Sequence, residues 1–538
     1  MPKSNSETKK VLKDLDFYFK VPNPGLRSYF GLVRAGQPEV YRTTFGKGRS
    51  PQTILKQWVQ QLGKLSKEWP TLLDFENDLA SKVGPMSVML PLKDRMKDID
   101  HYYEDILLPQ TPISTTGIES VLREWQPAAG LRIRGQNQTV ANMKLSTNSG
   151  NPYFGKRRRY VNDTIPCMLT EQNRELWQLL PGSHQFKCCA VLGWRGQEGG
   201  HTKEDVKQRV VWMFPFAVNV EELRFYQPAI EVAQDFGLVP AWVSMELVDA
   251  RITQLFDTKG RDDLVVCTDF SKFDQHFNPV MQDAAKQIIS GLITHDSSGE
   301  YWMKNVFPVK YYIPLMYDYG YLRVGQHGMG SGSGGTNFDE TVVHRALQWE
   351  AASSNSSTLN PNSQCLGDDG ILSYPGITVE DVVRSYTRHG LEMNRDKQYA
   401  SKHDCIYLRR WHHTKYRKDG ICVGVYSTAR ALGRLMYQER YYDPDVWSKE
   451  MVALRQLSII ENCKWHPMRE EFVAFCMKRD KYRLGLDIPG FFDNIQGIAK
   501  EATELMPDFL GYTKSLQEGK TVGNGIEDWW IVKYLKSM

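Results

Sequence analysis

The sequence of 538 residues lacks several features that would restrict its class. No apolar run approaches the roughly 20 residues that a membrane-spanning helix needs. The polar, basic N-terminus MPKSNSETKKVLKDL contains no apolar segment typical of a secretory signal. The nine cysteines include no C-x-x-C pair, which argues against both a disulfide framework and a zinc site. We therefore expect a protein of a reducing compartment, with no membrane among its partners.

Net charge alone indicates no partner, because 67 basic residues nearly balance 63 acidic ones. The charge is unevenly distributed, however. Between residues 121 and 160, eight basic side chains stand against one acid, Glu124. Such a local excess attracts polyanions. Its densest part is the run KRRR, Lys156 to Arg159, which is equally consistent with a solvated surface that binds nothing.

The order of apolar patterns predicts helices, then a mixed α/β centre, then helices. Residues 1–110 indicate a largely helical region with no recognisable chemistry, in which Ser50 and Pro51 begin one helix. The segment AASSNSSTLNPNSQ at 351–364 predicts a loop. From about residue 425 onward the spacing of apolar residues is mainly helical.

Two short apolar segments of the centre end at acids. LVVCTDF at 264–270 predicts a buried strand that places Asp269 at its C-terminal end. QCLGDDGILSY at 364–374 predicts a hairpin whose turn carries Asp368 and Asp369, with the following glycine taking the positive φ of the turn. A plain solvated turn is the alternative reading of the second segment.

Together these acids are suited to bind divalent metal. Carboxylates from different strands can hold Mg²⁺, which prefers oxygen ligands and retains water and substrate phosphate in its shell. Two such ions can promote an in-line phosphoryl transfer. We expect Asp269 to lie beside Asp368 and Asp369 at one edge of a sheet.

TDFSKFD at 268–274, SGSGGTN at 331–337 and LGDDG at 366–370 resemble, in this order, motifs A, B and C of viral RNA-dependent RNA polymerases. The flanking STNSGNPYFGKRRR and KQRVVWMFP most resemble the picobirnavirus enzymes, with partitivirus enzymes as relatives, and the likeness runs from about residue 144 to 412. The resemblance implies an α+β right-hand polymerase. Its divisions would be an N-terminal region bridging fingers and thumb at 1–110, fingers for template and NTP access at 111–260, a palm with an antiparallel sheet at 261–425 that includes a fingers insertion near 300–330, and a helical thumb with a C-terminal segment at 426–538.

The resemblance also implies roles for single residues. Asp269, Asp368 and Asp369 would hold two Mg²⁺ ions, for which Mn²⁺ can substitute. Asp274 would contact the sugar, because an acid suits the 2′-hydroxyl of a ribonucleotide. Many relatives place an Asn or Asp four positions after Thr336, where this chain has Glu340, so Asn337, Asp339 and Glu340 all stay open as its partner.

Further residues match the other motifs of the family. Lys397 would protonate the departing pyrophosphate, Arg209 with Lys207 would bind the triphosphate, and Arg409 would contact RNA. In the glycine-rich loop and helix start, Ser331, Gly332 and Thr336 would be nucleotide-binding. Template RNA would contact Ser149, Gly150, Lys156, Arg157, Arg158 and Arg159. The adjacent His412 and His413 lack further ligands at suitable spacing, and we reject a zinc site there.

The resemblance implies an enzyme that copies RNA for replication and transcription of a double-stranded RNA virus. Expected partners are RNA template and product, NTPs and viral capsid protein, for a monomer located in the virion interior and in host cytoplasm during infection. Two alternatives remain. A reverse transcriptase-like polymerase would share the metal chemistry, and a non-catalytic RNA-binding protein of the virion would use only the basic strip.

Overall fold

The computed structural model describes residues 6–505 and 525–538, which form a mixed α+β protein. Its first third is mainly helical, as predicted, although a strand, β1 (Glu7–Lys10), comes first. Ser50 caps α2 as expected, since its side chain accepts a hydrogen bond from the Thr53 amide. The helices of this part are α1 (Pro24–Ala35), α2 (Pro51–Leu62), α3 (Pro70–Ala80), α4 (Leu92–Glu104), α5 (Thr115–Glu124) and α6 (Gln136–Ala141).

A five-stranded sheet in the order β1-β9-β8-β5-β6 joins segments that are distant in the sequence. Its longest part is the antiparallel hairpin of β5 (Ala190–Gln197) and β6 (Lys207–Met213). The strands β8 (Leu315–Asp318) and β9 (Tyr321–Val324) connect this hairpin to β1. A separate sheet consists of β2 (Met168–Gln172), β3 (Glu175–Leu180) and β4 (His184–Lys187).

A four-stranded sheet in the order β10-β11-β7-β12 is antiparallel throughout. Its strands are β7 (Val265–Thr268), β10 (Gln364–Leu366), β11 (Asp369–Leu372) and β12 (Tyr399–Ser401). The long helix α14 (Thr336–Ser354) packs against β10 and also against α5, α11 (Pro279–Leu292) and α15 (Val379–Thr387). The remaining helices of the centre are α7 (Val161–Thr164), α8 (Phe216–Asp235), α9 (Pro240–Val243), α10 (Met245–Thr258), α12 (Ser297–Asn305) and α13 (Val309–Tyr312).

The C-terminal part shares one hydrophobic core with α2 and α3 of the N-terminal part. Trp58 of α2 is fully buried there against Phe472 and Phe475. This part begins with the sheet β13 (Asp404–Tyr407), β14 (Arg410–His413) and β15 (Val425–Tyr426) and continues with α16 (Thr428–Met436), α17 (Lys449–Glu461), α18 (Arg469–Arg479), α19 (Ile495–Leu505) and α21 (Trp530–Lys536). Residues 506–524 of the expected C-terminal helical region lie outside the described residues.

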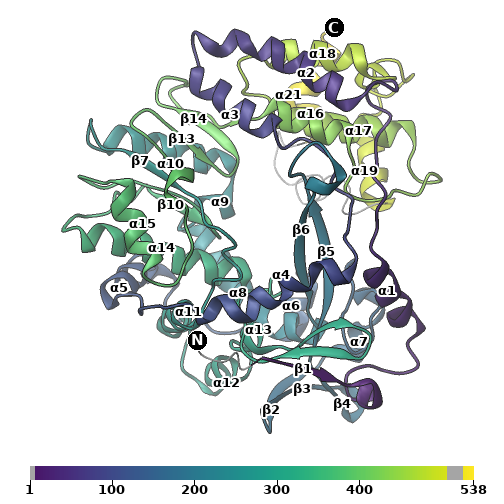
Figure 1. Ribbon diagram of the computed structural model, residues 1–538, viewed down its shortest axis with the longest axis vertical. Helices are drawn as coiled ribbons and strands as arrows, with labels where there is room; N and C mark the ends of the chain where they lie inside the picture. Colours follow the sequence, from purple (N-terminus) through teal and green to yellow (C-terminus); the bar gives the residue numbers. More distant parts are fainter. Residues whose placement is uncertain (1–5, 506–524) are drawn as a thin grey trace.

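Figure 1 shows these parts arranged around a central space. The C-terminal helices lie with α2 and α3 at the top, the four-stranded sheet with α14 and α15 at the left, and the β5–β6 hairpin at the right. The tip of the hairpin reaches toward the C-terminal helices, so the ring is closed.

The structure corrects the predicted loop at 351–364. Its first four residues belong to the last turn of α14, because Ala351 and Ala352 are buried and complete the apolar face of that helix. In the described part of the chain, no helix is long and apolar enough to cross a membrane.

Candidate active site

The acids at the ends of the two predicted strands meet at one edge of the four-stranded sheet. Gly370 of β11 pairs with Thr268 of β7, and the same register sets Asp369 opposite Asp269 one step further along. Asp368 precedes them in the turn of the β10–β11 hairpin. All three acids line one cavity of about 420 Å³. The structure thus brings together the three carboxylates that the sequence singled out.

In the turn of this hairpin, the positive φ belongs to a different glycine from the one expected. Gly367, before the two acids, has φ 57°, whereas Gly370 lies inside β11. A Cβ atom on Gly370 would lie 2.6 Å from the His344 ring, so the second glycine is required by close packing instead.

Burial raises the pKa of each of these three acids. Burial raises the pKa of Asp269, although Lys397, Lys82 and Lys207 oppose the change. Burial and the charge of Asp274 raise the pKa of Asp368. Burial raises the pKa of Asp369 to about 7, even though the Leu408 amide donates a 2.7 Å hydrogen bond to its Oδ2. A cluster of acids that is costly to ionise favours a divalent cation as counter-ion.

The donor set fits a hard cation, since it consists of carboxylate oxygens that face a solvent-accessible cavity. Within the described residues, no three acidic, histidine or cysteine side chains converge closely enough to form a complete metal site by themselves. Water and substrate phosphates would therefore have to supply part of the ligand shell, as they commonly do for Mg²⁺.

Helix α14 fixes the hairpin from behind. The Thr341 hydroxyl accepts a hydrogen bond from the Gly367 amide at 2.9 Å, and His344 Nδ1 donates to the Gly367 carbonyl at 2.8 Å. Burial lowers the pKa of His344 to about 4, so the ring is neutral. Both contacts hold the main chain next to Asp368 without touching its carboxylate.

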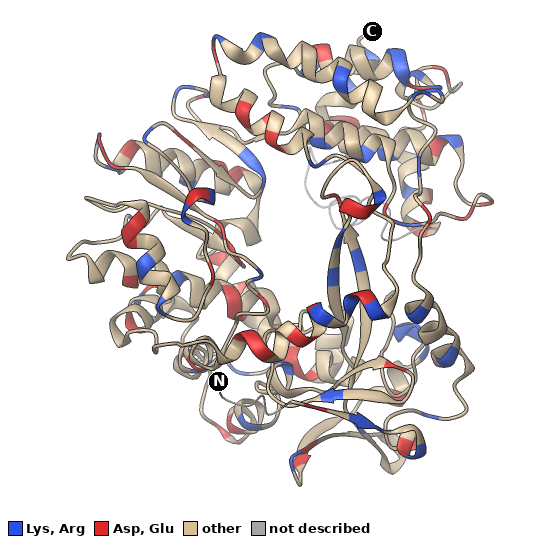
Figure 2. Cartoon of the chain, in the orientation of Figure 1, with Lys and Arg blue, Asp and Glu red and all other residues tan. Residues whose placement is uncertain are grey.

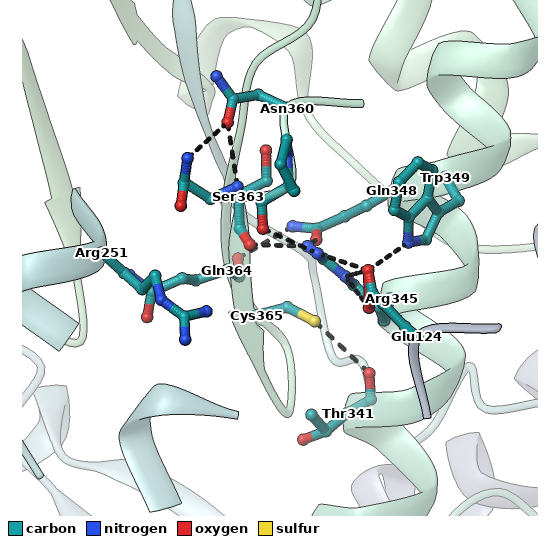
Figure 3. Close-up of polar contacts among 12 residues, drawn as sticks. Glu124, Arg251, Thr341, Arg345, Gln348, Trp349, Asn360, Ser363, Gln364 and Cys365 are labelled. Carbon is teal, nitrogen blue, oxygen red and sulfur yellow. Dashed lines mark hydrogen bonds and ion pairs between the residues drawn. The ribbon is translucent and has the colours of Figure 1, made fainter. Parts of the chain in front are cut away.

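Arg345 ties the segment before the hairpin to the same helix (Figure 3). Its guanidinium is bonded to Glu124 of α5 and donates to the carbonyls of Ser363 and Pro361. The Cys365 thiol lies 3.5 Å from the Thr341 carbonyl. Side chains buried behind the sheet thus set the position of the acidic turn.

Basic side chains line the same cavity. The predicted residues Lys207, Arg209, Lys397 and Arg409 all face it. Figure 2 shows basic positions along β5 and β6, across the central space from the four-stranded sheet. Burial, and then the charges of Lys82 and Arg409, lower the pKa of Lys207. The cavity therefore combines carboxylates with cations from several elements of the fold.

Sequence reasoning missed several lining residues. Asp78 and Lys82 come from the N-terminal region in which no chemistry was recognised, and Glu198, Arg430 and Arg434 come from the hairpin tip and α16. Asp78 and Lys82 form an i,i+4 ion pair, which in a sequence is indistinguishable from an ordinary solvated pair.

The candidates for sugar recognition separate clearly. Asp339 is fully buried and pairs with Lys310 at 3.0 Å, so it does not face the cavity. Asn337 accepts a 2.8 Å hydrogen bond from Trp242 through Oδ1. Glu340 is hydrogen-bonded to Asp274. Burial and the charge of Asp274 raise the pKa of Glu340 well above its usual value, so Glu340 carries the proton of this pair.

The glycine-rich loop packs directly on strand β6. A Cβ atom on Gly332 would lie 1.5 Å from the Trp212 carbonyl oxygen, so no larger residue fits there. The hydroxyl of Ser331 lies 3.4 Å from the Val210 carbonyl, and the Thr336 hydroxyl bonds to main-chain carbonyls within the loop. These predicted nucleotide-binding side chains are thus used in loop packing here.

The residues of the predicted template segment differ in how far they are exposed. Ser149 is buried, and its hydroxyl accepts a hydrogen bond from the Gly155 amide. Gly150 has φ 61° and packs on the Phe214 carbonyl. Arg157 is held by Asn219 and lies over the Phe216 ring. Only Lys156, Arg158 and Arg159 of the basic run are exposed.

Comparisons with known proteins show the family of the chain. Residues 133–476 match the family described as viral RNA-dependent RNA polymerase. The chain is 62% identical to the potential RNA-dependent RNA polymerase of human picobirnavirus (strain Human/Thailand/Hy005102/-) over 524 residues, which cover 97% of this chain and 98% of the relative. It is similar to the crystal structure of the RNA-dependent RNA polymerase of a human picobirnavirus, with TM-score 0.92 and 60% identity, covering 98% of this chain and 99% of that chain. An insertion loop deletion mutant of such an enzyme gives TM-score 0.91 and 59% identity, with the same coverage.

Proposed function

Because the chain belongs to the viral RNA-dependent RNA polymerases, closely related to that of human picobirnavirus, we propose that it copies the RNA of a double-stranded RNA virus by nucleotidyl transfer inside the particle. The family itself implies RNA template, NTPs and divalent metal. The finer proposal covers the residue roles, the mechanism and the use of the enzyme in both replication and transcription.

We assign the four-stranded antiparallel sheet to the palm, the five-stranded sheet with its β5–β6 hairpin to the fingers, and the helices from α16 onward to the thumb. The N-terminal region would bridge fingers and thumb. In support, α2 and α3 share a core with the C-terminal helices, whereas α1 and α4 pack in the core of the five-stranded sheet.

The observation that carries the mechanism is the convergence of Asp269, Asp368 and Asp369 on one cavity that basic side chains also line. In the reaction, the RNA 3′-hydroxyl attacks the α-phosphate of a templated NTP, and pyrophosphate leaves. Asp269 and Asp368 would hold two Mg²⁺ or Mn²⁺ ions, whose charge would activate the hydroxyl and stabilise the departing oxygen. Asp369 plays a lesser part, because its Oδ2 is already bonded to the Leu408 amide.

Basic side chains of the cavity would bind the triphosphate. Arg209 holds phosphate oxygens with its planar guanidinium, and Lys207 adds positive charge beside it. Lys397 would deliver a proton to pyrophosphate. Its place in the cavity beside Asp269 supports this role.

Sugar selection would depend on Asp274 with Glu340 as its partner. The protonated Glu340 holds the carboxylate of Asp274, which then accepts a hydrogen bond from the 2′-hydroxyl. Template RNA would pass the exposed Lys156, Arg158 and Arg159, which contact phosphates without reading sequence. Capsid protein as a partner, a monomeric state, and location in the virion and in host cytoplasm complete the proposal.

Asp368→Asn tests the proposal, with Asp262→Asn as the matched control, because Asp262 is an acid on the surface outside the cavity. We expect Asp368→Asn to abolish NTP incorporation on an RNA template and to keep RNA binding. Undiminished synthesis would refute the assignment of Asp368. Efficient incorporation of dNTPs by the unaltered enzyme would favour a reverse transcriptase-like polymerase instead.

A further inference from the structure

Glu198 lies where three parts of the chain meet. It follows β5 at the tip of the β5–β6 hairpin, and its Oε1 is 3.0 Å from Nε of Arg430 on α16. The same oxygen is 3.9 Å from Nη1 of Arg409, in the turn between β13 and β14. One carboxylate thus links the β5–β6 hairpin, the β13–β14 turn and the C-terminal helices.

The arginines around Glu198 outnumber it. Arg434 lies one helical turn beyond Arg430 on α16 and also lines the cavity. Among the described residues, no acid lies within ion-pair distance of Arg434, although its charge acts on Glu198. Three guanidinium groups therefore share one carboxylate beside the acidic turn, which leaves a net positive charge.

We propose that Arg409, Arg430 and Arg434 form a phosphate-binding subsite, and that Glu198 occupies this subsite until a phosphate group of RNA or nucleotide displaces it. This inference rests on the proposed function, since that function supplies the ligand. Guanidinium groups bind phosphate and carboxylate oxygens through the same planar geometry, so one can replace the other.

Glu198 is suited to such competition because it stays ionised. Burial raises the pKa of Glu198, but the charge of Arg430 and hydrogen bonds to the main chain and to Arg430 outweigh burial and keep the pKa below its usual value. At neutral pH an entering phosphate must therefore compete with a full negative charge.

Displacement of Glu198 would act on two other places. It would break the link between the hairpin tip and α16, beside a second ion pair at 2.9 Å between Arg195 of β5 and Glu439, which follows α16. It would also affect Arg409, whose neighbour Leu408 donates its amide hydrogen to Asp369. Phosphate binding and closure of the ring are then coupled, and the coupling is reciprocal.

The test measures binding without synthesis, using the full chain. Glu198→Gln keeps a hydrogen-bond acceptor for Arg430 but removes the competing charge. We expect it to bind a single-stranded RNA lacking 5′-phosphates three- to tenfold more tightly at low salt, or, if the phosphate belongs to a nucleotide, to bind NTP more tightly by a similar factor. Arg434→Ala should weaken binding of the same probe and reduce the salt slope of log K for RNA by about 0.7, as expected for one lost contact to a single strand.

Glu439→Gln is the matched control, because it breaks the ion pair of Arg195 and Glu439 between the hairpin and the C-terminal part. Neither Arg195 nor Glu439 lines the cavity. Glu439→Gln should leave both affinities unchanged. If Glu439→Gln tightens binding of the probe equally, the subsite is overturned, because opening of the ring alone would then explain the tighter binding. Unchanged affinities in Glu198→Gln would also overturn the subsite. If Glu198→Gln fails to fold, unchanged affinities in Arg434→Ala would overturn it instead. Absence of NTP incorporation by the unaltered enzyme would refute the proposed function while leaving these binding results intact.

Discussion

The side chain of Gln398 forms two hydrogen bonds with the main chain of Asp269. Its Oε1 accepts from the Asp269 amide at 2.7 Å, and its Nε2 donates to the Asp269 carbonyl at 2.9 Å. Gln398 lies between Lys397 and strand β12, which itself pairs with β7. The position of Asp269 is therefore fixed by a residue that does not touch its carboxylate.

Replacing Gln398 with alanine should reduce kcat about tenfold, which corresponds to about 1.4 kcal/mol. The loss follows because Asp269 would shift relative to Asp368. Lys207 and Arg209, which bind NTP, would stay in place. KM for NTP should therefore change little. Single-nucleotide incorporation under pre-steady-state conditions measures both quantities. Lys402→Ala, at an exposed position near the far end of β12, serves as control, and a kcat equal to that of the unaltered enzyme in Gln398→Ala would contradict the positioning role.

The strands that carry the acids were predictable because local patterns specify them. The apolar run before Asp269 forms β7, and the two short runs around Asp368 form an antiparallel hairpin. The contact of Gln398 with Asp269 spans 129 positions. No local pattern indicates such a contact, since it depends on how β12 pairs in the sheet.

The cavity shows the same division. Lys207 and Arg209 could be predicted because they begin a strand in a recognised motif, and the structure places both at the cavity. Lys82 could not, because the core that joins α2 and α3 to the C-terminal helices brings it there. The choice among Asn337, Asp339 and Glu340 was also open, because they share one helical turn and only packing distinguishes their surroundings.

Asp369 should make the metal-free protein less stable as pH rises. The folded protein holds the Asp369 proton up to a pKa of about 7, whereas in an unfolded chain an aspartate loses it near pH 4. The unfolded state therefore binds fewer protons between these values, and stability falls as pH rises from about 4 to about 7. Asp369→Asn does not titrate, so its free energy of unfolding should decline less over this range.

Denaturant unfolding in EDTA at pH 5 and pH 8 measures this effect. The difference in stability between Asp369→Asn and the unaltered protein should favour the variant more at pH 8 than at pH 5, by on the order of 3 kcal/mol at most, because the effect accrues over about two pH units. Added Mg²⁺ should diminish the difference if a cation replaces the proton. An identical pH dependence for both proteins would show that Asp369 is ionised in the folded state throughout.

The buried pair of Lys310 and Asp339 should dominate the stability of α14's first turn. Lys310 Nζ lies 3.0 Å from Asp339, which also accepts hydrogen bonds from Tyr226 and Tyr311. Lys310→Met leaves a buried carboxylate without its cation, which costs about 3–5 kcal/mol. Thermal unfolding measures the loss. Lys304→Met, on the nearby helix α12, is the control, and a loss below about 1 kcal/mol for Lys310→Met would show that the tyrosine hydroxyls suffice.

Glu340 should act as a hydrogen-bond donor to Asp274, so an amide should replace it. Glu340→Gln donates at every pH, and we expect its kcat/KM for NTP to stay within about threefold and its preference for NTP over dNTP to persist. Glu340→Ala leaves Asp274 without its partner and should lower that preference at least about tenfold. Competition between an NTP and its 2′-deoxy form measures the preference of each variant and of the unaltered enzyme. Asn337→Ala is the control on the same helix turn, since its amide oxygen accepts from Trp242. If Asn337→Ala loses the preference and Glu340→Ala keeps it, Asn337 is the partner of Asp274 at the ribose.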